Sequence, residues 1–132
     1  MRVLIADKDL PFLEISQNYL WERGFETEIA TNGLECLAIM REFHPDVLVL
    51  EADIFWGGGV GILALMKSSP RYSQVPVILI SDQRETFVRL AIAYPNLCAS
   101  LQKPFRLFDL LEQVKIIANM VSGARQLHSS LR

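Results

Sequence analysis

Short apolar runs along the chain predict five β-strands. Residues 3–6, 47–50 and 77–80 form continuous runs of aliphatic and β-branched side chains. Such runs are typical of strands that are buried on both faces of a parallel sheet. Residues 25–30 alternate between polar and apolar positions and predict a weaker edge strand, and residues 97–101 predict the last strand.

Stretches of helical spacing separate or follow these runs. Apolar residues recur every three or four positions at Phe12, Ile15 and Tyr19, at Cys36, Ile39, Met40 and Phe43, and from residue 107 to residue 121 before Gly123. Because each parallel strand needs a crossover helix, we expect an α/β fold with a doubly wound five-stranded parallel sheet and five helices. The predicted domain covers residues 1–122, and residues 123–132 form a polar tail or the stub of a linker.

The composition of the 132 residues agrees with one globular domain and disfavours several functions. Hydrophobic residues make up 51 % and charged residues 21 % of the chain. A net charge of -2 disfavours direct binding to nucleic acid or to an anionic membrane. The first apolar run is too short for a signal peptide or a membrane span, so we expect a cytoplasmic protein. Cys36 and Cys98 lack metal-ligand spacing and are expected to be buried free thiols.

Polar residues follow the predicted strands. In a doubly wound sheet, the functional crevice lies beyond the carboxyl ends of the strands. The residues there are Asp7, Lys8 and Asp9 after the first strand, Glu51 and Asp53 after the third, Ser81 after the fourth and Lys103 after the fifth. Acids, a hydroxyl group and two lysines are therefore expected on one rim.

The motifs VLIAD, PDVLVLE, VPVILIS and LQKPF carry most of these residues. With their spacing, the chain resembles the receiver domain of two-component response regulators from residue 2 to about residue 121. The resemblance implies a CheY-like, flavodoxin-like fold with strand order 2-1-3-4-5 and a role in phosphorelay signal transduction. It also implies a protein partner, such as a histidine kinase, an output domain or another regulator.

The resemblance assigns roles by position. Asp7 and Lys8 stand at the acid pair that holds Mg²⁺, Glu51 at the phosphoacceptor Asp, and Ser81 and Lys103 at the two residues that contact the phosphoryl group. Lys8 and Glu51 depart from the usual residues. Because the formal charges of the four ionisable side chains cancel, the attraction for a hard divalent cation is lost.

No cofactor is therefore expected, and Mg²⁺ is disfavoured. Asp7, Asp9 and Asp53 are the remaining candidates for metal ligands, although Asp9 also suits the N-cap of the first helix and Asp53 a solvent-facing position. The same charges predict an ion pair between Lys8 and Glu51. Two interpretations of Glu51 stay open, since it either imitates a phosphorylated Asp or only neutralises Lys8 or Lys103.

The segment after Glu51 adds further signals. Trp56 is either a contact residue or a side chain folded over the pocket. The glycines at 57–59 and 61 match no nucleotide-binding pattern and indicate a flexible connection. Ser100 stands where receivers often carry an aromatic switch residue, so the usual coupling between hydroxyl and aromatic side chains is not expected.

These observations predict a non-enzymatic pseudo-receiver that acts through protein–protein contacts without phosphorylation. Two alternatives remain open: a module that senses an anion or a nucleotide at the same rim, and an active receiver phosphorylated on Glu51. Homodimerisation through the last strand and helices is a further alternative, because residues 87–94 and 108–121 are strongly apolar.

Overall fold

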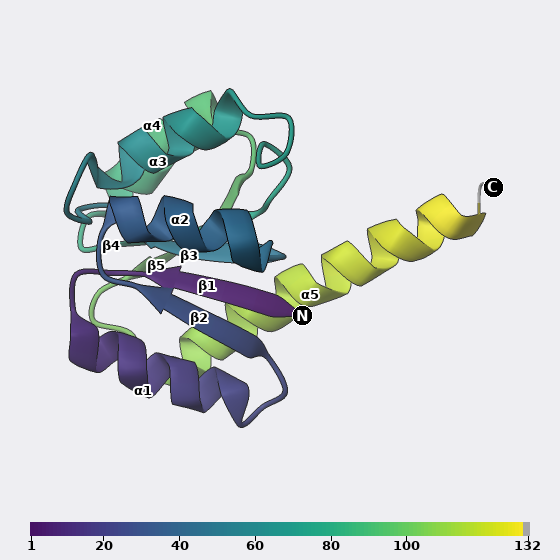
Figure 1. The fold of residues 1–132 in the computed structure, drawn as a ribbon, viewed down its shortest axis with the longest axis horizontal. Helices are drawn as coiled ribbons and strands as arrows, with labels where there is room; N and C mark the ends of the chain where they lie inside the picture. Colours follow the sequence, from purple (N-terminus) through teal and green to yellow (C-terminus); the bar gives the residue numbers. More distant parts are fainter. Residues whose placement is uncertain (131–132) are drawn as a thin grey trace.

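The computed structural model of the chain describes residues 1–130, and side chains as far as residue 123. Strands and helices alternate through this part of the chain (Figure 1). The strands are β1 (Arg2–Ala6), β2 (Glu26–Ala30), β3 (Val47–Glu51), β4 (Val77–Ser81) and β5 (Leu97–Gln102). The helices are α1 (Leu10–Trp21), α2 (Gly33–Phe43), α3 (Gly58–Lys67), α4 (Arg84–Ala93) and α5 (Leu107–Ser130).

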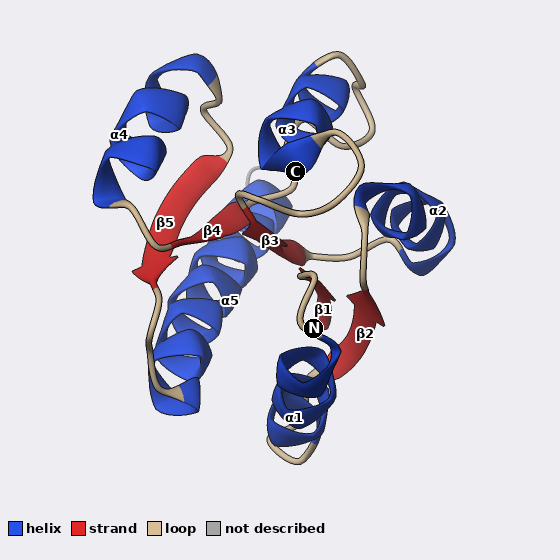
Figure 2. Cartoon of the chain, turned by 90° about the vertical axis from the view of Figure 1, so that its left-hand side faces the viewer, coloured by secondary structure: helices blue, strands red, loops and turns tan. Residues whose placement is uncertain are grey.

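The strands form one parallel sheet in the order β2-β1-β3-β4-β5. This order confirms the predicted doubly wound fold and places β2 at an edge. Figure 2 shows α1 and α5 on one face of the sheet and α2, α3 and α4 on the other. Because the winding reverses between β1 and β3, a crevice is expected beyond the carboxyl ends of these strands.

Two hydrophobic cores fill the space between the sheet and its helices. Successive strand residues point to opposite faces. Leu4 and Ala6 of β1 therefore join the core under α2, α3 and α4, whereas Val3 and Ile5 join the core with α1 and α5. The continuous apolar runs of the inner strands exist because both faces are covered, and removing this surface from water is the main stabilising contribution.

Polar caps fix the beginnings of α1 and α2. The carboxylate of Asp9 accepts a hydrogen bond of 3.2 Å from the N–H of Phe12, and Pro11 lies in the first turn, which confirms the predicted N-cap. The side chain of Asn32 accepts a hydrogen bond of 2.9 Å from the N–H of Glu35. These bonds satisfy N–H groups that have no partner inside the helix. They also hold the loops after β1 and β2 at the carboxyl end of the sheet.

The buried face of α1 differs from the predicted face. Leu13, Ser16 and Leu20 are buried, whereas Ile15 is 57 % exposed. The core position at Ser16 is filled by a small polar residue. A pattern that counts only apolar residues therefore misplaces the buried face by one position.

The last helix does not end at Gly123 as predicted. It continues to Ser130, well past the end of the sheet (Figure 1). An isolated glycine costs a helix about 1 kcal/mol relative to alanine, which is not enough to end it. The helix crosses the predicted domain boundary at residue 122, and this division of the chain stays a prediction. Residues 131 and 132 of the predicted tail lie outside the described residues.

The two thiols lie in different environments. Cys36 is buried, and burial raises the pKa of its thiol to about 12. Cys98 is exposed, contrary to the prediction, because it lies on the edge strand β5, where burial is interrupted along the strand.

Within the described residues, no helix is both long enough and apolar enough to cross a bilayer.

Candidate functional site

Three charged side chains meet at the carboxyl ends of β1, β3 and β5. Asp7 follows β1, Glu51 ends β3 and Lys103 follows β5. The Nζ atom of Lys103 donates a hydrogen bond of 2.7 Å to Oε2 of Glu51 and lies 3.3 Å from Oδ2 of Asp7. Asp7 is fully buried, and Glu51 is 4 % exposed. One ammonium group therefore bridges two buried carboxylates from different strands.

Lys8 approaches Glu51 from the solvent side. Its backbone N–H donates a hydrogen bond of 3.3 Å to Oε1 of Glu51, and its Nζ atom lies 3.8 Å from that oxygen. The predicted ion pair is thus present, but Lys103 makes a second and shorter one. Because the Lys8 side chain is 41 % exposed, water screens its ion pair more strongly. We call Asp7, Lys8, Glu51 and Lys103 the carboxylate–lysine cluster.

Burial and polar contacts act in opposite directions on the pKa values of Lys103 and Asp7. Burial lowers the pKa of Lys103, but its hydrogen bond to Glu51 and the charge of Asp7 outweigh burial, so the pKa lies above the usual 10.5. Burial raises the pKa of Asp7 above 3.8, although the N–H of Asp9, which donates a 2.9 Å hydrogen bond to Oδ1, opposes this effect. Lys103 is therefore held as a cation, and Asp7 accepts a proton more readily than an exposed Asp does.

Backbone hydrogen bonds fix the residues at the strand ends. The N–H of Asp7 donates to the carbonyl of Ala30 (3.0 Å), and the N–H of Lys103 donates to the carbonyl of Ser81 (2.9 Å). These bonds continue the pattern of the sheet beyond its last residues. The sheet, rather than a free loop, therefore positions the charged side chains.

Asp9 and Asp53 lie outside the cluster. The side chain of Asp9 caps α1, and Asp53 is exposed, both as predicted. In the part of the chain that the structure describes, no group of three or more His, Cys, Asp or Glu side chains is placed to hold a metal ion. The two buried carboxylates instead share the Lys103 ammonium group.

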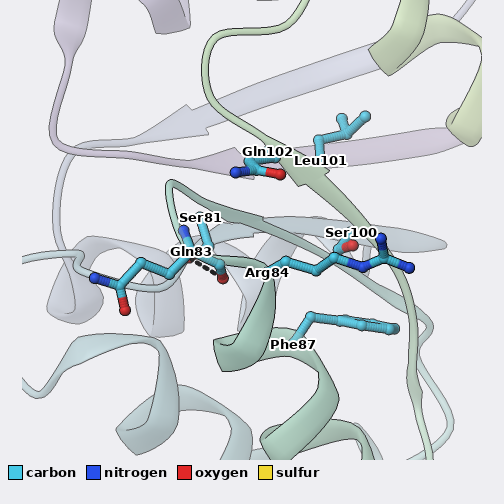
Figure 3. A pocket seen from close by; sticks show the side chains of 7 residues that line it. All are labelled: Ser81, Gln83, Arg84, Phe87, Ser100, Leu101 and Gln102. Carbon is cyan, nitrogen blue, oxygen red and sulfur yellow. Dashed lines mark hydrogen bonds between the residues drawn. The ribbon is translucent and has the colours of Figure 1, made fainter.

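Ser81 ends β4, but its hydroxyl group is engaged elsewhere. The Oγ atom donates a hydrogen bond of 3.0 Å to the carbonyl of Gln83 and accepts one of 3.0 Å from the N–H of Gln83 (Figure 3). The hydroxyl group thereby closes the turn that leads into α4. Of the predicted rim residues, Asp7, Lys8, Glu51 and Lys103 come together, whereas the side chain of Ser81 serves this turn.

A pocket of about 280 Å³ opens beside Ser81, between α4 and β5 (Figure 3). It is lined by Ser81, Gln83, Arg84, Phe87, Ser100, Leu101 and Gln102. Figure 3 shows the side chains of Arg84 and Phe87 running along the pocket from α4, with Ser100 on the β5 side. Of these residues, the sequence pointed to Ser81 and Ser100 as site residues, because the contributions of Arg84 and Phe87 to the pocket depend on where α4 packs.

A wider groove of about 480 Å³ lies beside Lys8. Its lining residues are Lys8, Thr31, Asn32, Leu34, Phe55 and Trp56. Trp56, one of the predicted site residues, forms a wall of this groove and is more than half exposed. No local sequence pattern placed it near Thr31 and Asn32, which lie in the turn between β2 and α2.

The glycine-rich segment is more ordered than predicted. Gly58, Gly59 and Gly61 belong to α3 rather than to a flexible connection. A Cβ atom on Gly59 would lie 3.1 Å from the carbonyl oxygen of Glu51 and from Cα of Ala52. The absence of this atom allows α3 to begin directly against the end of β3.

Comparison with known proteins places this chain in a family. The family model of the response regulator receiver domain matches residues 3–115. The chain belongs to this family. Receiver domains are signalling modules of two-component systems, and they interact with histidine kinases and output domains. The match runs from the second residue of β1 to the first turns of α5.

Three curated relatives show how far the likeness extends. The probable transcriptional regulator ycf29 of Pyropia yezoensis is 27 % identical over 92 % of this receiver domain and 53 % of that protein. Protein Rrf1 of Nitratidesulfovibrio vulgaris is 25 % identical over 79 % of this chain and 72 % of that protein. The chain spans about half the length of ycf29 and of the DNA-binding response regulator MtrA from Mycolicibacterium paratuberculosis.

Solved structures agree with the fold of this receiver domain. The Francisella response regulator 1452 receiver domain has a TM-score of 0.81 at 24 % identity and covers 91 % of this chain and 98 % of that chain. The chemotaxis protein CheY4 of Vibrio cholerae has a TM-score of 0.80 at 21 % identity. The match covers 88 % of this chain and 97 % of the CheY4 chain. At this level of identity, the likeness supports the architecture and leaves the chemistry to the residues of the site.

Proposed function

We propose that this receiver domain signals without being phosphorylated, and that its carboxylate–lysine cluster occupies the place of the phosphorylation site. The observation that carries the proposal is the short ion pair between Lys103 and Glu51, at 2.7 Å, on a lysine that also contacts Asp7. The signal would then pass through protein–protein contacts with a histidine kinase, an output domain or another regulator.

The surroundings of Glu51 argue against phosphoryl transfer to it. Glu51 stands at the end of β3, where the resemblance puts the phosphoacceptor Asp. Its Oε2 atom accepts a hydrogen bond from Lys103, and its Oε1 atom faces the N–H and the ammonium group of Lys8. Phosphoryl transfer requires a carboxylate oxygen atom in line with the transferred phosphorus. Here, both oxygen atoms already have cationic or N–H partners.

The charges of the cluster also argue against Mg²⁺. This ion demands an octahedron of oxygen ligands and is usually held by carboxylates. The two lysines cancel the charge of Asp7 and Glu51, and Lys103 contacts both carboxylates. The residues present therefore do not suit the ion. Without it, the negative charge that develops during phosphoryl transfer lacks its usual stabilisation.

Glu51 holds Lys103 in the way that the resemblance assigns to a phosphoryl group. The carboxylate offers one charge and two oxygen atoms, whereas a phosphate offers three oxygen atoms and about -1.5 to -2 charges. We propose that this ion pair fixes the lysine permanently. The cluster would then hold the domain in one state, and changes in partner concentration would replace changes in phosphorylation.

A phosphorylation assay tests this proposal. The protein is incubated with Mg²⁺ and acetyl phosphate or a histidine kinase, and the intact mass is measured at neutral pH. In parallel, Trp56 fluorescence is followed during titration with Mg²⁺ and beryllofluoride in a Trp21→Phe background. We expect no phosphoryl adduct and no saturable fluorescence change. An acyl phosphate mapped to Glu51 would contradict the proposal and support an active receiver.

The matched control restores the usual acids. In the variant Lys8→Asp/Glu51→Asp, the cluster again carries net negative charge, and we expect Mg²⁺ binding to return. The single variant Glu51→Gln keeps Lys8 and should stay unresponsive. A double variant that folds but still does not bind Mg²⁺ would show that charge cancellation is not what prevents Mg²⁺ binding.

The proposed contact surface comprises α4, β5 and α5. Its exposed apolar residues are Val88, Ile92, Phe108, Ile116 and Met120. Isolated exposed apolar residues are common, but large contiguous patches mark interfaces. We propose that a second copy of the chain covers this surface. Light scattering after gel filtration should show dimers that Ile92→Lys dissociates, whereas Leu65→Lys on α3 should not. Monomers at all concentrations would contradict this part of the proposal.

A further inference from the structure

The groove beside Lys8 combines aromatic and cationic groups from separate loops with an aliphatic side chain, Leu34, from α2. Lys8 comes from the loop after β1, Thr31 and Asn32 from the turn before α2, and Phe55 and Trp56 from the loop before α3. Its volume of about 480 Å³ lies within the range of small-molecule sites. Such sites typically have apolar walls and a few polar groups, as this groove does.

Backbone contacts fix the loop that carries the two aromatic side chains. The N–H of Gly33 donates a hydrogen bond of 2.8 Å to the carbonyl of Phe55, which ties the loop to the start of α2. A side chain at Gly33 would overlap the carbonyl oxygen of Trp56. Trp56 has a φ of 68°, a conformation that bulky residues rarely adopt. Phe55 is 64 % and Trp56 57 % exposed, although one edge of the Trp56 ring lies close to Gly33.

The polar groups of the groove differ in how fully their hydrogen-bonding capacity is used within the protein. The N–H and hydroxyl of Thr31 both donate to the carboxylate of Glu35, and the side-chain oxygen of Asn32 caps α2. Lys8 is the only charged residue among the described residues that line the groove. Its ammonium group makes one long ion pair, at 3.8 Å, with a carboxylate that Lys103 already binds at 2.7 Å. Lys8 is therefore the group best able to meet an anion.

We propose that this groove binds a planar aromatic molecule that carries a negatively charged group. The ring packs against Trp56 and Phe55, since aromatic side chains bind flat rings by stacking. The anion contacts the ammonium group of Lys8 in a charge-assisted hydrogen bond. A nucleotide and an aromatic carboxylic acid share this chemistry. The inference goes beyond the proposed function, because it holds whether or not Glu51 accepts a phosphoryl group.

Trp56 fluorescence provides the test. In Trp21→Phe, Trp56 is the only tryptophan, because the chain has two. The probes are AMP and phenylacetate, their uncharged counterparts adenosine and phenylacetamide, and inorganic phosphate alone, all without Mg²⁺ or a phosphodonor. We expect at least one charged aromatic probe to bind with a Kd below about 1 mM. It should bind about tenfold more tightly than its uncharged counterpart and than phosphate.

Variants separate the two parts of the site. Lys8→Met should remove the preference for the charged probe and leave binding of the uncharged probe unchanged, whereas Lys115→Met, on the exposed surface of α5, should alter neither. Trp56→Leu should weaken the binding of both probes, and calorimetry measures these affinities because the variant lacks the fluorescent reporter. Thermal unfolding confirms that each variant is folded. Tighter binding of AMP than of phenylacetate identifies a nucleotide-type ligand, and the reverse identifies an aromatic carboxylic acid.

Two results would overturn the inference. The first is the absence of saturable binding for both charged aromatic probes. The second is a folded Lys8→Met variant that keeps the full preference for charge. Neither result bears on phosphorylation, and an acyl phosphate on Glu51 would leave this inference intact. The two proposals therefore fail independently.

Discussion

His44 and Trp56 have positive φ angles although neither is glycine. The angles are 52° and 68°. For residues with a Cβ atom, this left-handed conformation costs roughly 1–2 kcal/mol. His44 is the C-cap of α2, and its N–H donates to the carbonyl of Met40. Its ring also contacts the guanidinium group of Arg71, with Nη2 2.8 Å from Nε2. The helix end thus requires a conformation for which glycine is better suited.

The variant His44→Gly should stabilise the protein by about 0.5–1 kcal/mol, because relief of the left-handed conformation outweighs the loss of an exposed contact. His44→Ala is the matched control, since it loses the same contact but keeps the unfavourable φ. Urea unfolding measures both free energies. If the alanine variant is as stable as the glycine variant, the backbone conformation does not limit stability here.

At the scale of elements, close contacts between α2 and the loop before α3 shape the site. Gly33 begins α2 and packs against the backbone of Trp56, while Gly59 packs against the end of β3. Gly61 lies in the same helix as Gly59 but has open space around the position of a Cβ atom. Neighbouring glycines in one segment therefore serve different purposes, and only the packing distinguishes them.

Alanine substitutions should reveal this difference. Gly33→Ala forces the loop away from α2 and should destabilise the protein by about 1–3 kcal/mol. Gly61→Ala adds a methyl group without a clash and should stabilise the protein by up to about 1 kcal/mol, because alanine is the better helix former. Thermal and urea unfolding measure both effects. Equal effects of the two substitutions would show that the Gly33 contact is not tightly packed.

At the scale of the whole molecule, Lys103 links the ends of three strands. Its ammonium group contacts carboxylates on β1 and β3, while its N–H bonds to β4. Because the pKa of Lys103 is raised in the folded state, its contribution to stability is complete below pH 10.5 and is lost as the pH rises through the folded value. The raised pKa of Asp7 acts in the same direction at lower pH, since this carboxyl favours the folded state most at acid pH and less as the pH rises above 3.8.

Lys103→Met should therefore destabilise the protein at pH 7 by about 1–3 kcal/mol, because two buried carboxylates lose their shared cation. The loss should shrink toward pH 4, where protonation removes the uncompensated charge. Adding Asp7→Asn should recover part of the stability at pH 7. Chemical unfolding across this pH range measures the effect. A loss that does not depend on pH would mean that Lys103 stabilises by packing rather than by charge.

The sequence by itself determined the sheet and the chemistry at its rim. Continuous apolar runs are compatible with strands covered on both faces, and polar residues directly after parallel strands must gather at one edge. The resemblance to receiver domains implied the strand order, and the charges at the positions that it assigned predicted the ion pair of Lys8 with Glu51. The N-cap at Asp9 could also be predicted from the sequence, because the hydrogen bond joins residues only three positions apart.

Only the tertiary structure decided how residues distant in sequence meet. The shorter ion pair of Glu51 is with Lys103, and this depends on the spacing between strands rather than on any local pattern. The hydroxyl group of Ser81 turned toward Gln83, and Trp56 came to lie beside Lys8 and the turn before α2. The buried face of α1 and the exposure of Cys98 also followed from packing. Periodicity shows which residues can be buried, but the neighbouring elements decide which side chains meet.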